Sequence, residues 1–109
     1  MRKKPEVQRQ IAAQCVLNVR NGSGVSRKEL STVMNMSPST AGFYVDQLIA
    51  RGFLIETGLG HGMVGRPKRC LEARKEAGWF AGLEWSADQL QAVNVDFAGT
   101  RQGGIERAL

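Results

Sequence analysis

Side chains that could make specific contacts with a partner gather in two segments of the chain. Residues 37–47 supply hydroxyl, amide and aromatic groups, and residues 66–69 form the basic run Arg-Pro-Lys-Arg. Hydroxyls and amides can hydrogen-bond to the edges of DNA bases, and an aromatic ring can contact a thymine methyl. Arginine suits a narrow minor groove, where the negative potential is deep. Both segments therefore favour recognition of a polyanion.

Catalytic and metal-binding sites have little support in the sequence. The chain has one histidine, His61, in a glycine-rich stretch, and two cysteines, Cys15 and Cys70, without the spacing of metal ligands. No nucleophile is paired with a base, and no phosphate-binding loop occurs. We therefore predict no catalytic site, no metal and no cofactor. Both cysteines are expected to be small buried hydrophobes, with a disulfide between them as the minor alternative.

Charge divides the chain into two parts. Residues 1–75 hold 13 Lys and Arg against 5 acids, a net +8, whereas residues 76–109 hold 2 Arg against 5 acids, a net −3. A basic first part implies an anionic partner, either nucleic acid or an acidic membrane surface. We expect no membrane partner, because no predicted helix sets a large apolar face beside a basic one. Without an apolar run of about 18 residues or a signal core, a cytoplasmic protein is expected.

Two helices are expected in the first 34 residues. Apolar residues recur at three- and four-residue spacing from 6 to 20, which predicts a helix that ends at the turn 21–24. Gly22 is expected to adopt the left-handed conformation there. Ser26 to Glu29 forms a capping box, which predicts the start of a second, short helix. The apolar face of this second helix is expected to hold Leu30, Val33 and Met34.

A third helix is expected from Pro38 to Arg51. Asn35 can adopt the left-handed conformation in the turn before it, Ser37 is the expected N-cap, and Pro38 suits the first helical position. At about 100° per residue, one face is apolar, and the opposite face is small, polar and aromatic. The apolar stripe holds Ala41, Val45, Leu48 and Ile49. The opposite face holds Ser39, Thr40, Phe43, Asp46 and Gln47, with Tyr44 at its border.

A basic β-hairpin is expected after the third helix. Residues 53–57 and 70–73 read as strands, joined by the glycine-rich loop 58–65 and the basic run 66–69. Helix, capped helix, turn, capped helix and basic hairpin is the order of a winged helix-turn-helix domain, an α+β fold. In that fold the third helix enters the major groove and the second helix braces it.

The last part of the chain reads as a separate β-hairpin. We predict a domain boundary between residues 1–75 and 76–109, strands at 79–85 and 89–97, and a turn that begins at Asp96, with a third strand from Thr100 as an open alternative. An isolated hairpin is only marginally stable, so it must dock on the first domain, pair with another chain or belong to a larger domain. Its aromatic residues are expected to pack in a core: Trp79, Phe80, Trp85 and Phe97.

Several segments of the chain resemble one known family. They are 16–21, 25–30, 37–40, 45–54 and the Gly-Arg-Pro of 65–67, and together they resemble the N-terminal half of ROK-family transcriptional regulators, repressors related to bacterial sugar kinases. Residues 78–99 look like the opening hairpin of the family's sugar-binding domain. In the kinase branch this hairpin holds an Asp-x-Gly-x-Thr phosphate loop, and residues 84–87 replace that loop here. The winged-helix part alone is shared in outline with MarR-like regulators.

The resemblance implies a sequence-specific DNA-binding regulator, a repressor of carbohydrate-related genes, that contacts double-stranded DNA as a homodimer. A sugar effector would act only through a further C-terminal domain. The base-reading residues would be Ser39, Thr40, Phe43 and Gln47, and the wing residues Arg66, Lys68 and Arg69. The expected phosphate contacts are Arg27, Lys28, Ser37 and Tyr44.

Two other functions stay open at this point. In a protein-interaction module, Phe43 and Tyr44 would anchor a partner instead of reading bases. The third reading is a non-catalytic N-terminal fragment of a ROK sugar kinase.

Overall fold

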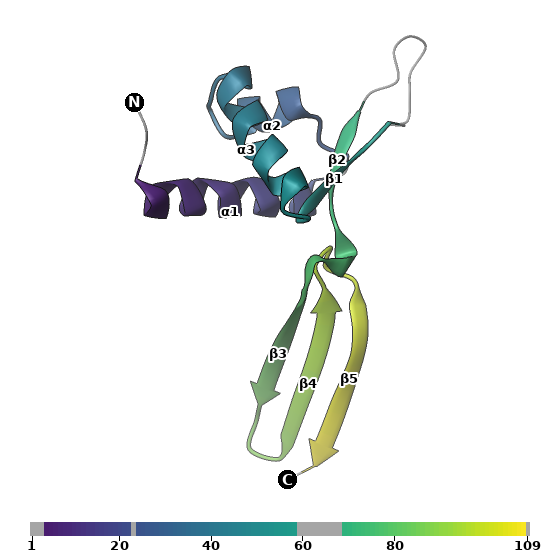
Figure 1. Ribbon diagram of the computed structural model, residues 1–109. Coiled ribbons are helices and arrows are strands. Elements are labelled where there is room, and N and C mark those ends of the chain that lie inside the picture. Colours follow the sequence, from purple (N-terminus) through teal and green to yellow (C-terminus); the bar gives the residue numbers. More distant parts are fainter. Residues whose placement is uncertain (1–3, 23, 59–68, 109) are drawn as a thin grey trace. The chain divides into compact units, whose positions relative to one another are not determined.

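The computed structural model describes residues 4–22, 24–58 and 69–108, which form two compact units, Met1–Ala73 and Arg74–Leu109 (Figure 1). The first unit contains α1 (Pro5–Asn21), α2 (Arg27–Val33), α3 (Pro38–Ala50), β1 (Leu54–Thr57) and β2 (Cys70–Ala73). The second contains the short 3-10 helix η1 (Lys75–Ala77), β3 (Trp79–Trp85), β4 (Gln89–Asp96) and β5 (Arg101–Ala108). The units divide two residues before the boundary expected from the sequence.

The expected caps set the starts of α2 and α3. Ser26 Oγ accepts from the backbone N–H of Glu29 at 3.1 Å, and its hydroxyl donates to the Glu29 carboxylate at 3.1 Å. Ser37 Oγ accepts from the backbone N–H of Thr40 at 3.2 Å. Asn35, with φ of 53°, takes the left-handed conformation between the two helices. Both N-caps and the turn residue are confirmed.

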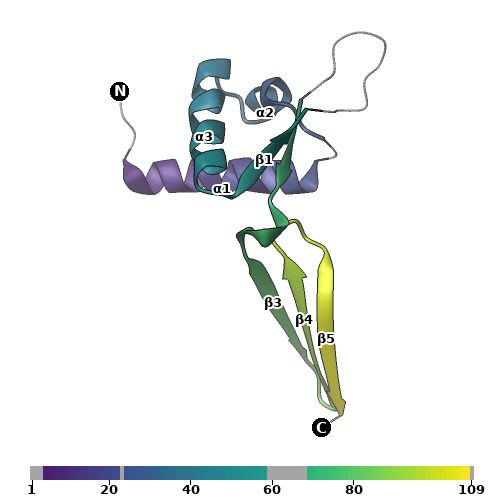
Figure 2. The same cartoon turned by 45° about the vertical axis from the view of Figure 1, so that its right-hand side comes forward.

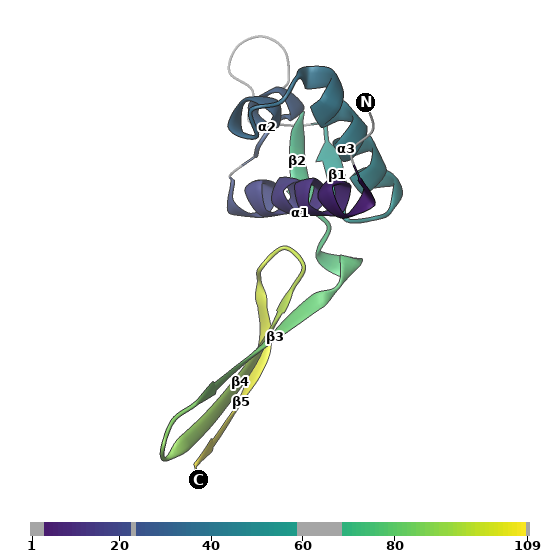
Figure 3. The same ribbon diagram turned by 90° about the vertical axis from the view of Figure 1, so that its left-hand side faces the viewer.

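The core of the first unit joins all three helices to the strand pair. Figure 2 shows α3 running steeply across α1, and Figure 3 shows β1 and β2 between α2 and α3. The largest fully buried side chains come from every one of these elements: Leu30, Leu54, Leu71, Val45 and Cys15. The predicted stripe on α3 is confirmed, since Ala41, Val45 and Leu48 are buried and Ile49 packs against the cluster.

Two predictions about helix faces are wrong. Val33 was expected on the apolar face of α2, but its side chain is 64% exposed, because α2 ends there and Met34 packs against the core instead. Tyr44 was expected at the border of the outward face of α3, but it is only 4% exposed and belongs to the core cluster. Helical periodicity predicts which face of a helix a side chain lies on. Whether that side chain is buried depends on the neighbouring helices and strands that pack against that face.

The wing strands pair as predicted, and a further segment joins them. β1 and β2 are antiparallel, with Leu54 opposite Ala73 and Thr57 opposite Cys70. The backbone N–H of Leu71 donates to the carbonyl of Val25 at 2.7 Å, which makes an isolated antiparallel bridge. The sequence did not reveal this bridge, which ties the entry to α2 to the base of the wing.

Gly22 closes α1 differently from the prediction. Its φ of −90° and ψ of 161° are extended, and its N–H donates to the carbonyls of Asn18 and Val19. The left-handed residue of this turn is Gly24, with φ of 76°. What requires a glycine at position 22 is space, because a Cβ there would collide with Cγ2 of Val25.

We expect Gly22→Ala to lower the free energy of unfolding by about 1–3 kcal/mol, since relieving the collision must move Val25 or the end of α1. Urea denaturation followed by helical circular dichroism measures this. Gly58→Ala is the matched control, because a Cβ on Gly58 meets nothing within 4 Å. Equal stability of the two variants would contradict the steric explanation.

The second unit is a three-stranded antiparallel sheet in the order β3-β4-β5. The predicted hairpin is confirmed, and the third strand, left open by the sequence, is present from Arg101. Asp96 holds the turn between β4 and β5: its carboxylate accepts from the N–H of Thr100 and from Nε2 of Gln102, each at 3.0 Å. Gly99 supplies the left-handed conformation, with φ of 97°.

The prediction that the aromatic residues of this sheet pack in a core is wrong for both tryptophans and for Phe80, which is 46% exposed. Trp79 is 69% exposed and Trp85 is 77% exposed. Phe80 and Phe97 do stack, with ring centroids 5.8 Å apart. Trp79 pairs with Asp96 and Trp85 pairs with Leu90 in the ladder between β3 and β4, so the face that holds the tryptophans is part polar and part apolar.

Candidate nucleic-acid interface

Three hydroxyl groups gather at the exposed start of α3. Ser37 Oγ donates to Thr40 Oγ1 at 2.9 Å and lies 3.2 Å from Ser39 Oγ. All three residues are exposed. Small hydroxyl side chains allow close approach of a helix to DNA and can bond to bases or phosphates. The structure therefore brings two of the predicted base-reading residues, Ser39 and Thr40, together with the predicted phosphate contact Ser37.

Phe43 and Tyr44 have different positions, although they are adjacent in the sequence. Phe43 is 49% exposed on the outward face of α3, and its ring meets that of Tyr44 edge-on, with centroids 5.3 Å apart. Because Tyr44 is in the core, it supports Phe43 from below. We therefore remove Tyr44 from the set of phosphate contacts. The same burial weakens the interaction-module reading, which needs both rings on the surface.

Gln47 lies where α3 approaches α1. A groove of about 590 Å³ between these helices is lined, among others, by Gln47 of α3, by its C-cap Arg51, and by Gln8 and Arg9 of α1. Gln47 is exposed, and the two arginines add positive charge beside it. The outward face of α3 thus has cationic side chains along one edge. The phosphates of DNA lie along the edges of a helix that is inserted in the major groove.

Arg27, a predicted phosphate contact, is held by two carboxylates. Its Nε lies 2.8 Å from Glu56 Oε2, its Nη2 donates to Glu56 Oε1 at 3.2 Å, and its Nη1 lies 2.8 Å from Asp46 Oδ1. The hydrogen bond to Glu56 raises the pKa of Arg27 above its ordinary value, and Asp46 adds to the shift. A Cβ on Gly42 would lie 3.9 Å from Nη1, so the guanidinium rests against the backbone of α3. Arg27 therefore links α2, α3 and β1.

The other predicted contacts are exposed or lie outside the described residues. Lys28, next to Arg27 on the first turn of α2, is exposed. Arg69, just before β2, has a side chain 74% exposed with its Nη1 3.9 Å from Glu56 Oε1. The wing residues Arg66 and Lys68 fall in 59–68, outside the described residues, as does His61.

Glu56 is the residue that sequence reasoning missed. Its side chain is only 16% exposed, and it contacts two arginines that were assigned to DNA. In the sequence it is one acid in a short strand, and its partners are 29 and 13 positions away. Glu56 lies on the same face of the strand as Leu54, because alternate residues of a strand share a face. Only this could have suggested that its carboxylate points inward and needs a positively charged partner.

Both cysteines are buried, as predicted, and they are not joined in a disulfide. Burial raises the pKa of the Cys15 thiol above its ordinary value. Within the described ranges, no group of three His, Cys, Asp or Glu could hold a metal ion. None of the described helices is long and apolar enough to cross a membrane.

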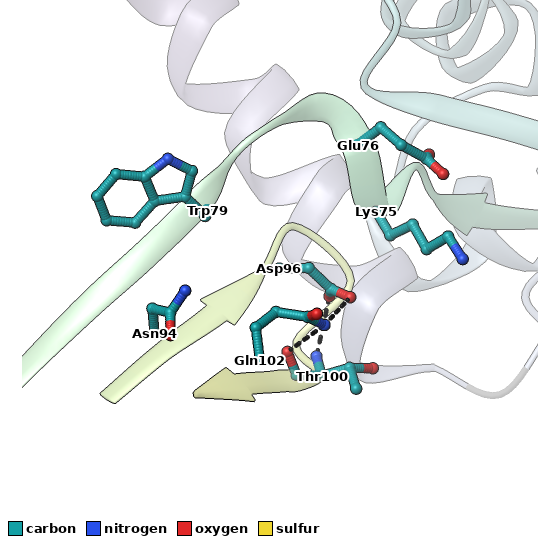
Figure 4. Close-up of a pocket in the computed structure, with 7 residues that line it drawn as sticks. All are labelled: Lys75, Glu76, Trp79, Asn94, Asp96, Thr100 and Gln102. Carbon is teal, nitrogen blue, oxygen red and sulfur yellow. Dashed lines mark hydrogen bonds between the residues drawn. The ribbon is translucent and has the colours of Figure 1, made fainter. Parts of the chain in front are cut away.

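A second depression, within the last unit, does not compete as a site. It is open, and its lining includes Lys75, Trp79 and the Asp96 turn (Figure 4). The polar atoms of that turn already bond to one another, since Asp96 accepts from both Thr100 and Gln102. The cluster is explained by the turn that it holds.

Comparisons with known proteins find curated relatives and a solved structure that are similar to this chain. No family model matches the chain. A protein of Caldicellulosiruptor sp. (strain Rt8B.4), provisionally named xylose repressor, is 32% identical over 75 residues, 69% of this chain. The xylose repressor of Bacillus subtilis (strain 168) is 30% identical over 78 residues, 72% of this chain.

A solved structure is also similar to this chain. It is the crystal structure of a ROK family transcriptional regulator, a homologue of the E. coli MLC protein, with a TM-score of 0.64, 16% sequence identity and 94% of this chain covered. The predicted resemblance to ROK-family regulators is confirmed. The α+β winged helix-turn-helix fold is confirmed with it.

The match covers one part of each relative. This chain corresponds to 19% of the Caldicellulosiruptor protein, 20% of the Bacillus protein and 26% of the solved regulator.

Proposed function

We propose that this chain is the DNA-binding region of a sequence-specific transcriptional regulator, a repressor of carbohydrate-related genes. The observation that carries this proposal is the outward face of α3, where Ser39, Thr40, Phe43 and Gln47 are all exposed on a winged-helix scaffold. The major groove is wide enough to admit a helix with such a face. The similarity to xylose repressors supports the carbohydrate-related role.

The interface would divide into base reading and phosphate binding. Ser39, Thr40, Phe43 and Gln47 read bases, whereas Lys28 and Ser37 hold the backbone. The wing contributes Arg69, together with Arg66 and Lys68 by sequence. Phosphate contacts supply affinity without sequence information, and base contacts supply preference.

In this proposal the protein binds double-stranded DNA and does not catalyse a reaction. It acts in the cytoplasm. A symmetric homodimer would place two α3 helices in successive turns of the major groove and so strengthen binding. A sugar effector would need a further domain beyond the region matched here.

Selection from a random duplex library tests the division of roles. We expect wild-type protein to enrich a motif, and Ser39→Ala or Gln47→Ala to relax preference at individual positions by about 5- to 150-fold. Lys28→Ala should instead weaken all duplexes alike, because a phosphate contact is blind to sequence.

Circular dichroism of each variant controls for folding, and all three side chains are exposed. Uniform weakening by Ser39→Ala, Gln47→Ala and Lys28→Ala would mean that α3 does not read bases. Salt-insensitive binding that enriches no motif would favour the interaction module instead.

A further inference from the structure

We propose that Glu56 is a positioning residue for DNA recognition, which fixes the base of the wing against α2 and α3 through Arg27 and Arg69. The inference rests on the proposed function and assigns Arg27 a different role from the phosphate contact expected from the sequence. It concerns how α3 and the β1–β2 hairpin are held at a fixed spacing from each other.

The network is a chain of four alternating charges from four places in the fold. Asp46 of α3 contacts Arg27, the first residue of α2, at 2.8 Å. Arg27 contacts Glu56 of β1 at 2.8 Å, and Glu56 lies 3.9 Å from Arg69, just before β2. The network therefore joins α3 to α2 and joins α2 to both sides of the hairpin.

The geometry at Glu56 fixes the orientation of the Arg27 guanidinium relative to the Glu56 carboxylate, which a simple attraction between charges would not do. The Nε and Nη2 groups of Arg27 meet the two oxygens of one carboxylate side-on, which orients both planar groups. The Glu56 side chain is 16% exposed, so water screens this contact less than it does a surface pair. Such a bidentate contact resists sliding of β1 relative to α2.

Charge accounting also argues against a simple phosphate role for Arg27. Each of its three guanidinium nitrogens lies within 3.2 Å of a carboxylate oxygen. Two arginines and two acids cancel, so the network as a whole adds no net attraction for DNA. Its contribution is then the spacing of α3 and the wing, which must hold to within a fraction of an ångström for both to make contact.

Glu56→Gln gives a test in which the two explanations predict different results, because a change of charge alone leaves the ratio between two duplexes unaltered. On charge alone, removal of an acid near phosphates strengthens binding to every duplex. On the present inference, the affinity ratio between the selected motif and a random duplex falls by about fivefold despite the added positive charge, because α3 and the wing lose their register. Fluorescence anisotropy with both duplexes measures the ratio.

Two further variants separate position from charge. Arg27→Lys keeps the charge but loses the planar fork, so the inference expects a similar fall in the ratio, whereas a phosphate contact tolerates lysine. Glu72→Gln is the matched control, since Glu72 is an exposed acid on β2 of the same hairpin. It should leave the ratio unchanged.

Folding and register are checked without DNA. Helical circular dichroism should stay at the wild-type level, and amide hydrogen exchange in β1 should quicken in Glu56→Gln and Arg27→Lys but not in Glu72→Gln. Unchanged exchange together with an unchanged affinity ratio in both variants overturns the inference while the proposed function stands. A wild-type chain that enriches no motif overturns both.

Discussion

The affinity of this chain for DNA should fall about 250- to 1,000-fold as salt rises from about 50 to about 200 mM. The exposed basic residues of the first unit outside the Glu56 network include Lys28, Arg9 and Arg51. With about five phosphates contacted, release of condensed counterions gives a slope near −4 to −5 in log affinity against log salt. Titration of one labelled duplex at four salt concentrations measures the slope.

Lys28→Ala provides the internal standard for this experiment. Loss of one phosphate contact should make the slope shallower by about 1. Arg27→Lys should leave the slope close to that of wild type, because lysine keeps the positive charge at this position. A slope near zero for the wild-type chain would contradict the proposal that contacts with phosphates supply the affinity for DNA.

Leu30→Ala should destabilise the first unit by about 2–5 kcal/mol, because it empties a fully buried site in the core. Leu30 lies on α2, which supports α3, so DNA binding should be lost together with the fold. Urea denaturation followed at a helical wavelength reports on this unit, since α1, α2 and α3 all belong to it.

Val33→Ala is the matched control on the same helix. Its side chain is 64% exposed, so truncation should change the free energy of unfolding by about 0.5 kcal/mol or less. The sequence pattern alone would have ranked Leu30 and Val33 as equals. Similar losses in the two variants would mean that α2 packs as the pattern suggested and not as the structure shows.

The local sequence determined the elements of the winged helix. Caps at Ser26 and Ser37 and the left-handed residue Asn35 bond or turn within a few residues, so short-range rules identify them. The strands of the wing and the apolar stripe of α3 followed from periodicity for the same reason. The family resemblance came from these same segments.

Features that depend on contacts between distant segments were not predictable from the pattern. Gly22 is required by the position of Val25, and the bridge from Val25 to Leu71 joins residues 46 positions apart. The exposure of Trp79 and Trp85 depends on what covers the sheet, which alternation along a strand does not encode. In each case the deciding neighbour comes from another element.

The candidate site shows the same division between sequence and tertiary structure. By itself the sequence determined which side chains share the outward face of α3, because residue types at helical spacing fix that face. Only the tertiary structure decided that Tyr44 is buried and that Arg27 is held by Glu56 and Asp46. An arginine looks the same in a sequence whether its charge faces a phosphate or a carboxylate, and only packing brings the partner to it.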